Sequence, residues 1–200
     1  MTRLFDHPNF QWPPKECDAV LAAIGRIVFN FNTCERTITQ MLNVLIGGDH
    51  HAVIVTAHMG TNTQLDALRT LAAEYQQADQ REHIAHSIKL FERVRERRNY
   101  YIHSYAFVPG NPGPTAGMQS WSARGRLKIH KEVVTAETLE NEARMIMRAT
   151  EYLALVHNHF SMPDDLTYQT LPERFPLPDA LTKPFEYAQD AGYQPRSYPR

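Results

Sequence analysis

Long apolar segments are missing from this chain of 200 residues. No run of 18 consecutive apolar residues occurs, so we expect no membrane-spanning helix. Residues 1–16 lack the apolar core of a secretory signal peptide, which makes the cytoplasm the expected location. Cysteine is scarce, and the two cysteines of the sequence are Cys17 and Cys34. Both fall in one predicted helix, about 25 Å apart along its axis, and this distance excludes a disulfide between them.

Several signatures of enzymes and metal sites are also missing. The chain has no Walker-type phosphate loop, no dinucleotide-binding glycine pattern and no nucleophile elbow. His83 and His86, three positions apart on a predicted helix, could share a metal ion, but no third ligand is evident. The segment from His157 to His159 is too short to identify a nuclease. We therefore expect neither a metal nor a cofactor.

Charge is nearly balanced overall, with 21 lysines and arginines against 22 aspartates and glutamates. Its distribution is uneven, because residues 81–131 hold ten basic and three acidic residues, a net charge of +7. Such a surface attracts a polyanion. The alternative is a solvated helix face, on which Glu92 and Glu96 pair with neighbouring arginines. The candidate RNA-binding residues are Arg95, Arg124, Arg126 and Lys128.

A hydrophobic content of 42% is sufficient for the core of one domain. Apolar residues recur at helical spacing up to Gly47-Gly48, which is a stop signal. Thr61 and Gln64 match a capping box at the start of a later helix. The spacing predicts helices over residues 13–46, 51–58, 61–75, 80–104 and 135–160, of which the second is only a short piece.

These elements predict an all-α fold, an antiparallel four-helix bundle over residues 1–162. Short strands at 105–108, 118–122 and 126–130 predict a small β-hairpin insertion at about 105–131, between the third and fourth long helices. Seven of the thirteen prolines follow Met162. Residues 163–200 should therefore form an extended, proline-rich tail that lies across the bundle or a partner.

The most informative segment lies at the end of the predicted helix over residues 80–104. At 100° per residue, Arg98 points along the middle of the apolar face, and Asn99 and His103 lie at its edge. A guanidinium facing a core is unfavourable unless it is paired or borders a cleft. Glu35, close to the apolar face of the first helix, is the expected structural partner of Arg98.

The sequence Arg98-x4-His103, with Asn99 after the arginine, resembles the defining motif of the HEPN superfamily of four-helix-bundle domains. The resemblance covers roughly residues 14–160 and includes the place of the motif at the end of the third long helix. It implies a metal-independent endoribonuclease, of the kind found in toxins and defence systems. It also implies a homodimer in which two copies of the motif face each other.

The resemblance assigns roles to three residues. His103 would move a proton at the ribose 2′-hydroxyl or at the leaving 5′-oxygen, and Arg98 would stabilise the phosphorane-like transition state. Asn99 would orient His103 or bind phosphate. The alternative function is a non-catalytic, dimeric module that binds RNA, a nucleotide or a protein. In that case Arg98 anchors the core and His103 caps the helix.

Tyr105 extends the motif to Arg98-x4-His103-x-Tyr105. This form resembles that of HEPN toxins paired with minimal nucleotidyltransferase antitoxins, in which the tyrosine is adenylylated. The resemblance implies an antitoxin partner and marks Tyr105 as a possible modification site. The alternative is that Tyr105 is an ordinary core or strand residue.

Overall fold

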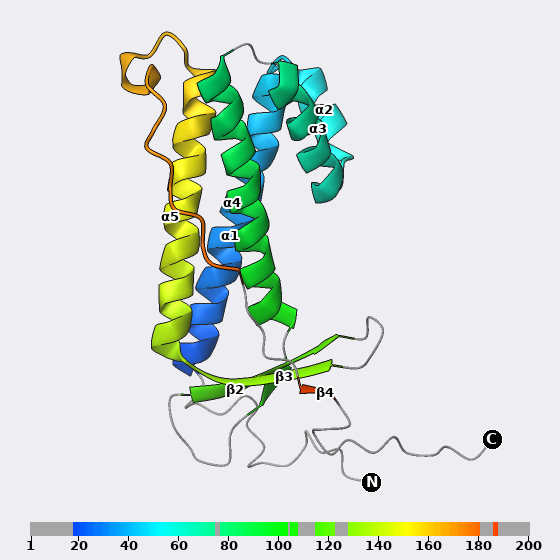
Figure 1. Cartoon of the computed structure of the whole chain (residues 1–200), viewed down its shortest axis with the longest axis vertical. Coiled ribbons are helices and arrows are strands. Elements are labelled where there is room, and N and C mark those ends of the chain that lie inside the picture. The colour runs from blue at the N-terminus through cyan, green and yellow to red at the C-terminus, as the bar shows by residue number, and fades with distance from the viewer. Residues whose placement is uncertain are drawn as a thin grey trace, which may run out of the picture. The chain divides into compact units, whose positions relative to one another are not determined.

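The computed structural model describes residues 18–74, 77–103, 105–107, 115–122, 128–180 and 186–187. The chain is mostly helical, as the sequence predicts (Figure 1). Its helices are α1 (Asp18–Leu45), α2 (His50–Ala57), α3 (Thr61–Glu74), α4 (Ala78–His103) and α5 (Ala136–Ser161), followed by a 3-10 turn at Leu166–Tyr168. No helix within these ranges combines the length and apolar character that a membrane crossing requires.

The chain forms two compact units. One unit, called the helical unit here, comprises Ile27–Arg98 and Glu142–Leu181. The other, called the sheet unit, comprises Met1–Arg26, Asn99–Asn141 and Thr182–Arg200. The boundary therefore passes through the candidate motif, because Arg98 is in the helical unit whereas Asn99 and His103 are in the sheet unit.

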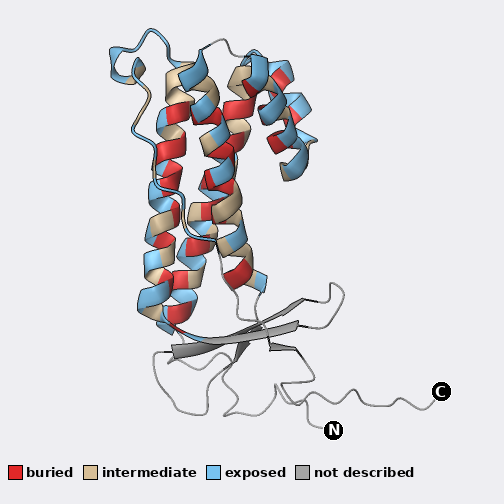
Figure 2. Cartoon of the chain, in the orientation of Figure 1, coloured by how far each residue is buried: buried red, intermediate tan, exposed pale blue. Residues whose placement is uncertain are grey.

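The core of the helical unit follows from the apolar spacing of its long helices. Side chains three or four positions apart share one face of a helix. In α1 the buried residues of this face are Ile27, Phe31, Cys34, Ile38, Met41 and Leu42, and in α5 they are Ala143, Ile146, Ala149, Leu153 and Val156. Figure 2 shows that buried positions lie on the sides of the helices that face one another, and that exposed positions lie on the outer sides. The apolar residues that recur at helical spacing in the sequence therefore form this core.

The end of α1 is set by two glycines with positive φ, 120° at Gly47 and 70° at Gly48. The amide of Gly48 donates to the carbonyl of Asn43 (2.8 Å), and that of Gly47 donates to the carbonyl of Val44 (3.2 Å). This pair of bonds satisfies carbonyls that the helix end leaves without a partner. Asp49 then caps α2, because its side chain accepts from the amide of Ala52.

The directions of the helices correct the simple antiparallel four-helix bundle. Contacts between Glu35 and Thr61 and between Thr39 and Gln64 show that α3 runs in the direction of α1. The short helix α2 causes this, because it turns the chain back along α1 before α3 begins (Figure 1). Helix α4 is antiparallel to α5, as the pairs Arg97–Glu142 and His86–Tyr152 indicate.

The sheet unit contains four antiparallel strands in the order β1-β2-β3-β4. They are β1 (Tyr105–Phe107), β2 (Thr115–Ser122), β3 (Lys128–Thr135) and β4 (Glu186–Tyr187). The longest pairing joins β2 and β3, from Thr115 opposite Thr135 to Ser122 opposite Lys128. β2 and β3 extend beyond the strands predicted from alternation, and β4 lies in the proline-rich tail, where no strand is predicted.

After α5 the chain continues as an extended segment along α4 and α5 (Figure 1, orange). We call residues 163–180 the strap. Its backbone carbonyls at Tyr168 and Pro172 contact His159 of α5 and His83 of α4. The strap therefore lies against both helices of the helical unit.

Candidate functional site

Arg98, the first residue of the motif, is half-buried on α4. Its guanidinium carbon lies 5.1 Å from the centre of the Phe31 ring of α1, and its Nε atom is buried. A cation over an aromatic face is attracted by the ring quadrupole. The same ring stacks on Phe91, with centroids 5.6 Å apart. Arg98 is therefore packed against the aromatic part of the core.

Glu35 is placed differently from the expected ion pair. Its carboxylate accepts a hydrogen bond of 2.8 Å from the hydroxyl of Thr61 at the start of α3. Among the ion pairs of the described ranges, none joins Glu35 to Arg98. The two charged groups lie at different heights along α1, because the guanidinium lies over Phe31, one helical turn before Glu35.

Asn99 and His103 occupy the last turns of α4. Asn99 is half-buried, and His103 is exposed and is the final residue of the helix. On a regular helix these two side chains diverge by only about 40°, whereas Arg98 and His103 diverge by about 140°. His103 is thus the accessible acid–base group of the motif, and its direction from the helix axis differs from that of Arg98.

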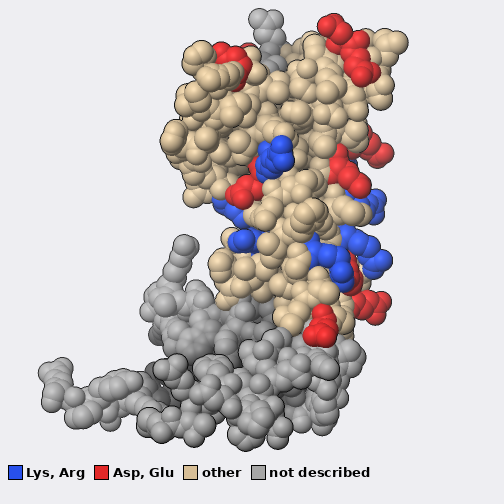
Figure 3. Space-filling model, turned by 180° about the vertical axis from the view of Figure 1, so that it is seen from behind, with Lys and Arg blue, Asp and Glu red and all other residues tan. Residues whose placement is uncertain are grey.

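The arginines of α4 mostly have partners in the described part of the chain. Arg97 forms a two-bond ion pair with the half-buried Glu142 and also donates to the carbonyl of Asp179 (3.1 Å). Arg93 lies 3.5 Å from Glu96. On the face shown in Figure 3, basic and acidic side chains lie beside one another rather than forming one positive surface. The solvated, charge-paired face weighed from the sequence therefore describes much of α4.

Of the four residues assigned to RNA binding, the structure gives side-chain contacts for Arg95. It donates to the side-chain oxygen of Asn62 on α3 (2.7 Å) and lies 6.0 Å from the ring centre of Phe91. Arg124 and Arg126 lie outside the described residues. Lys128 is placed by its backbone alone, opposite Ser122 and Tyr187, and Tyr105 likewise lies opposite Gln119.

Three histidines that the motif does not include bind the strap. The ring Nε2 atoms of His83 and His86 lie 3.0 Å from the carbonyl oxygen of Pro172 and 2.7 Å from that of Phe175. The Nδ1 atom of His159 lies 2.7 Å from the carbonyl oxygen of Tyr168. A carbonyl oxygen only accepts, so each imidazole donates. The described residues contain no group of three metal ligands, and the spacing of His83 and His86 serves the strap instead.

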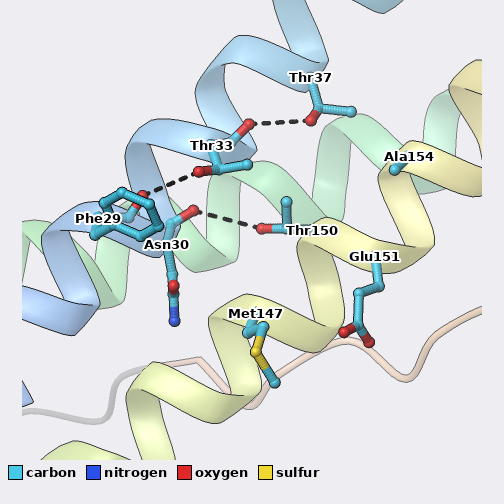
Figure 4. Close-up of a pocket in the computed structure, with 8 residues that line it drawn as sticks. All are labelled: Phe29, Asn30, Thr33, Thr37, Met147, Thr150, Glu151 and Ala154. Atoms are coloured by element: carbon cyan, nitrogen blue, oxygen red, sulfur yellow. Dashed lines mark hydrogen bonds between the residues drawn. The ribbon is translucent and has the colours of Figure 1, made fainter.

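An apolar groove with a volume of about 360 Å³ lies between α1 and α5 in the helical unit. Figure 4 shows Phe29, 73% exposed, at its rim. The hydroxyls of Thr37 and Thr150 donate to carbonyls of their own helices. The groove therefore offers methyl and aromatic surface rather than reactive groups. Its lining residues are Phe29, Asn30, Thr33, Thr37, Met147, Thr150, Glu151 and Ala154.

Cys34 is excluded as a nucleophile. It is fully buried in the core, and burial raises the pKa of its thiol to about 12. A thiol with that pKa carries almost no thiolate near neutral pH.

No family model, curated protein or solved structure shows a significant match to this chain. The candidate site is therefore the C-terminal end of α4. It presents an exposed imidazole at His103, a half-buried amide at Asn99 and a guanidinium packed on Phe31. These groups have the chemistry to move a proton and to bind an anion.

Proposed function

We propose that this chain is a HEPN-like, metal-independent endoribonuclease whose active site lies at the end of α4. The observation that carries the proposal is the exposure of His103 at the end of a long helix, five positions after the inward-packed Arg98. The proposal includes a HEPN-like helical bundle in which α1 and α3 run in the same direction, with the hairpin of β2 and β3 as an insertion.

The reaction would need no bound cofactor. One histidine removes the proton of the ribose 2′-hydroxyl, and the resulting oxyanion attacks the adjacent phosphorus. The bond from phosphorus to the 5′-oxygen then breaks, the leaving oxygen takes up a proton, and a 2′,3′-cyclic phosphate remains. Arg98 would stabilise the charge that develops on the phosphoryl oxygens, and Asn99 would hold the imidazole or a phosphate oxygen. DNA lacks the 2′-hydroxyl and would not be cut.

Two copies of the chain would complete this site. Arg98 and His103 of one regular helix point about 140° apart, so one copy does not aim both at the same phosphate. A two-fold homodimer brings the same patch of both copies together, so His103 of one copy can act with Arg98 of the other.

The test is RNA cleavage in EDTA with analysis of the product ends. We expect the wild type to cut single-stranded RNA, and His103→Ala to abolish cleavage without changing the melting temperature. His58→Ala, at an exposed histidine that caps α2, is the matched control and should retain full activity. Equal cleavage by wild type and His103→Ala would identify a contaminating nuclease and remove the proposal.

A specific observation favours a second candidate, a non-catalytic, dimeric module that binds RNA, a nucleotide or a protein. Arg98 packs on Phe31, and Arg97 already has Glu142 as a partner. In this case RNA would bind without being cut, and His103→Ala would leave its affinity unchanged. A gel-shift assay beside the cleavage assay separates the two functions.

The toxin form of the proposal adds Tyr105 as a modification site. A nucleotidyltransferase-type antitoxin would transfer the nucleotide of ATP to its hydroxyl and release pyrophosphate. Mass spectrometry of the chain after coexpression with a nucleotidyltransferase encoded beside it should then locate the adduct on Tyr105. Modification at another tyrosine, or none, would remove this part.

A further inference from the structure

The strap is bound mainly through its own backbone. Carbonyl oxygens at Tyr168, Pro172 and Phe175 accept from His159, His83 and His86. Backbone carbonyls are present in any sequence, so these three bonds recognise an extended chain rather than particular side chains. Prolines at 172, 176 and 178 restrict the backbone toward this extended form before it binds.

Two side chains of the strap add selectivity. The Arg174 guanidinium pairs with Glu82 and lies 3.6 Å from Asp79, both on α4. The ring of the next residue, Phe175, lies under the Arg148 guanidinium of α5, 5.7 Å from ring centre to carbon. This surface therefore selects a basic residue followed by an aromatic one. The basic residue binds α4 and the aromatic residue binds α5.

The strap buries little of itself in return. None of the side chains at 163–180 is buried, and Leu166 is 82% exposed. Apolar burial is the main source of stability in a folded element, and the strap contributes few apolar side chains to the core. A segment that buries few apolar side chains belongs to the part of a protein that opens locally.

We infer that the α4–α5 surface under the strap is a binding site for an extended, proline-containing peptide segment with an Arg-Phe pair. The chain's own residues 163–180 occupy this site and leave it reversibly. When they leave, the same segment of a second copy can take their place. The groups that bind it are the imidazoles of His83, His86 and His159, the carboxylate of Glu82 and the guanidinium groups of Arg97 and Arg148.

The first test measures binding of a fluorescent peptide with the sequence of residues 163–180. The full-length double variant Arg174→Ala/Phe175→Ala weakens binding of the chain's own strap and leaves the α4–α5 surface unchanged. We expect it to bind the peptide at least tenfold more tightly than the wild type does. Glu173→Ala, at an exposed strap residue, is the matched control and should behave as the wild type.

The specificity of that binding is checked with a second peptide that carries alanine in place of Phe175. It should bind the double variant several-fold more weakly than the natural peptide. If the double variant keeps its helical circular dichroism and binds the natural peptide no better than the wild type, the strap is a fixed part of the fold and the inference is wrong.

The second test uses the unmodified strap. Trypsin cuts after Arg174 only when this side chain leaves Glu82 and enters the protease, so cleavage at this bond reports release. His86→Ala removes one hydrogen-bond donor of the α4–α5 surface and should increase the rate of cleavage several-fold. His157→Ala removes a nearby histidine whose ring bonds to Asn158 and should not change the rate. Equal rates in all three proteins would contradict reversible release.

Discussion

Arg98 illustrates how a charged side chain occupies an inward-facing helix position. The sequence indicates that such a residue needs compensation, and it points to Glu35 as the source. In the structure the guanidinium lies over the Phe31 ring, and Glu35 accepts from Thr61. The Phe31 ring is therefore one group that stabilises the Arg98 guanidinium, and Glu35 makes a different contact.

This difference leads to a double-mutant cycle. Arg98→Met keeps the apolar stem and removes the charge, and Phe31→Leu removes the aromatic face. We expect a coupling of about 0.5–1 kcal/mol between them in chemical denaturation. Arg98→Met combined with Glu35→Gln should show a coupling close to zero. A larger coupling with Glu35 than with Phe31 would restore the ion pair expected from the sequence.

His86 allows a prediction on protonation. Desolvation under the strap lowers the pKa of His86, and the nearby cations add to this, whereas its bond to the Phe175 carbonyl opposes it. The charged and titratable groups around it are Arg174 of the strap, His83 and Lys89 of α4, Asp79 and Glu82 beside Arg174, and Tyr152 of α5.

Because binding of the strap to the α4–α5 surface, called docking below, lowers the pKa of His86, docking favours the neutral imidazole. The His86 contribution to docking is then fully present above pH 6.5 and is lost as the pH falls through the lowered value. In an NMR titration the His86 midpoint should lie below 6.5 in the wild type. It should move toward 6.5 in Arg174→Ala/Phe175→Ala. An identical midpoint in both proteins would show that the strap does not shield this ring.

Among the elements, the boundary after α1 depends on backbone conformation. Gly48 has a φ of +70°, and a Cβ added there meets no atom within 4 Å. Gly48→Ala should therefore destabilise the chain by about 1 kcal/mol through backbone strain alone. Gly25, inside α1 and equally open, is the matched control. Gly25→Ala should stabilise by about 0.5–1 kcal/mol in thermal unfolding, and a stabilising Gly48→Ala would contradict this account.

Helix periodicity and end signals were sufficient to predict most elements of this chain. The predicted range 61–75 corresponds to α3 at Thr61–Glu74, and 135–160 corresponds to α5 at Ala136–Ser161. These patterns are local, because each residue contributes to its own helix whatever lies opposite. Directions and partners are not local, and here the sequence was less informative.

Gln64 is an example of what local patterns miss. It matches a capping box with Thr61, but its side-chain amide donates to the carbonyls of Thr56 and Met59, and its oxygen accepts from Thr39. The tertiary contacts of a buried amide take precedence over a local cap. The strap was predicted as an extended tail, but the histidines that bind it could not be paired with Tyr168, Pro172 and Phe175 from spacing alone, because those bonds span up to 89 positions.

For the molecule as a whole, the relevant geometry is that Arg98 and His103 diverge by about 140° around α4. A catalytic site that uses both is easier to form from two copies than from one. We therefore expect light scattering at micromolar concentration to give a mass near twice 23.0 kDa. A monomer that nevertheless cleaves RNA would show that one copy is sufficient, and the two-copy site would be wrong.

The pairing of β4 with β3 has a consequence for how the strap moves. Because Glu186 and Tyr187 pair with Ile129 and Lys128, the chain is held by β4 after the strap as well as by α5 before it, so the strap is not a free tail. A flexible segment of the strap's length has a mean span of about 23 Å, so a released strap stays near the α4–α5 surface. Its effective local concentration is then on the order of millimolar. A free peptide that competes for the α4–α5 surface must reach a similar concentration. The strap of a second copy that is already bound nearby has a comparably high local concentration.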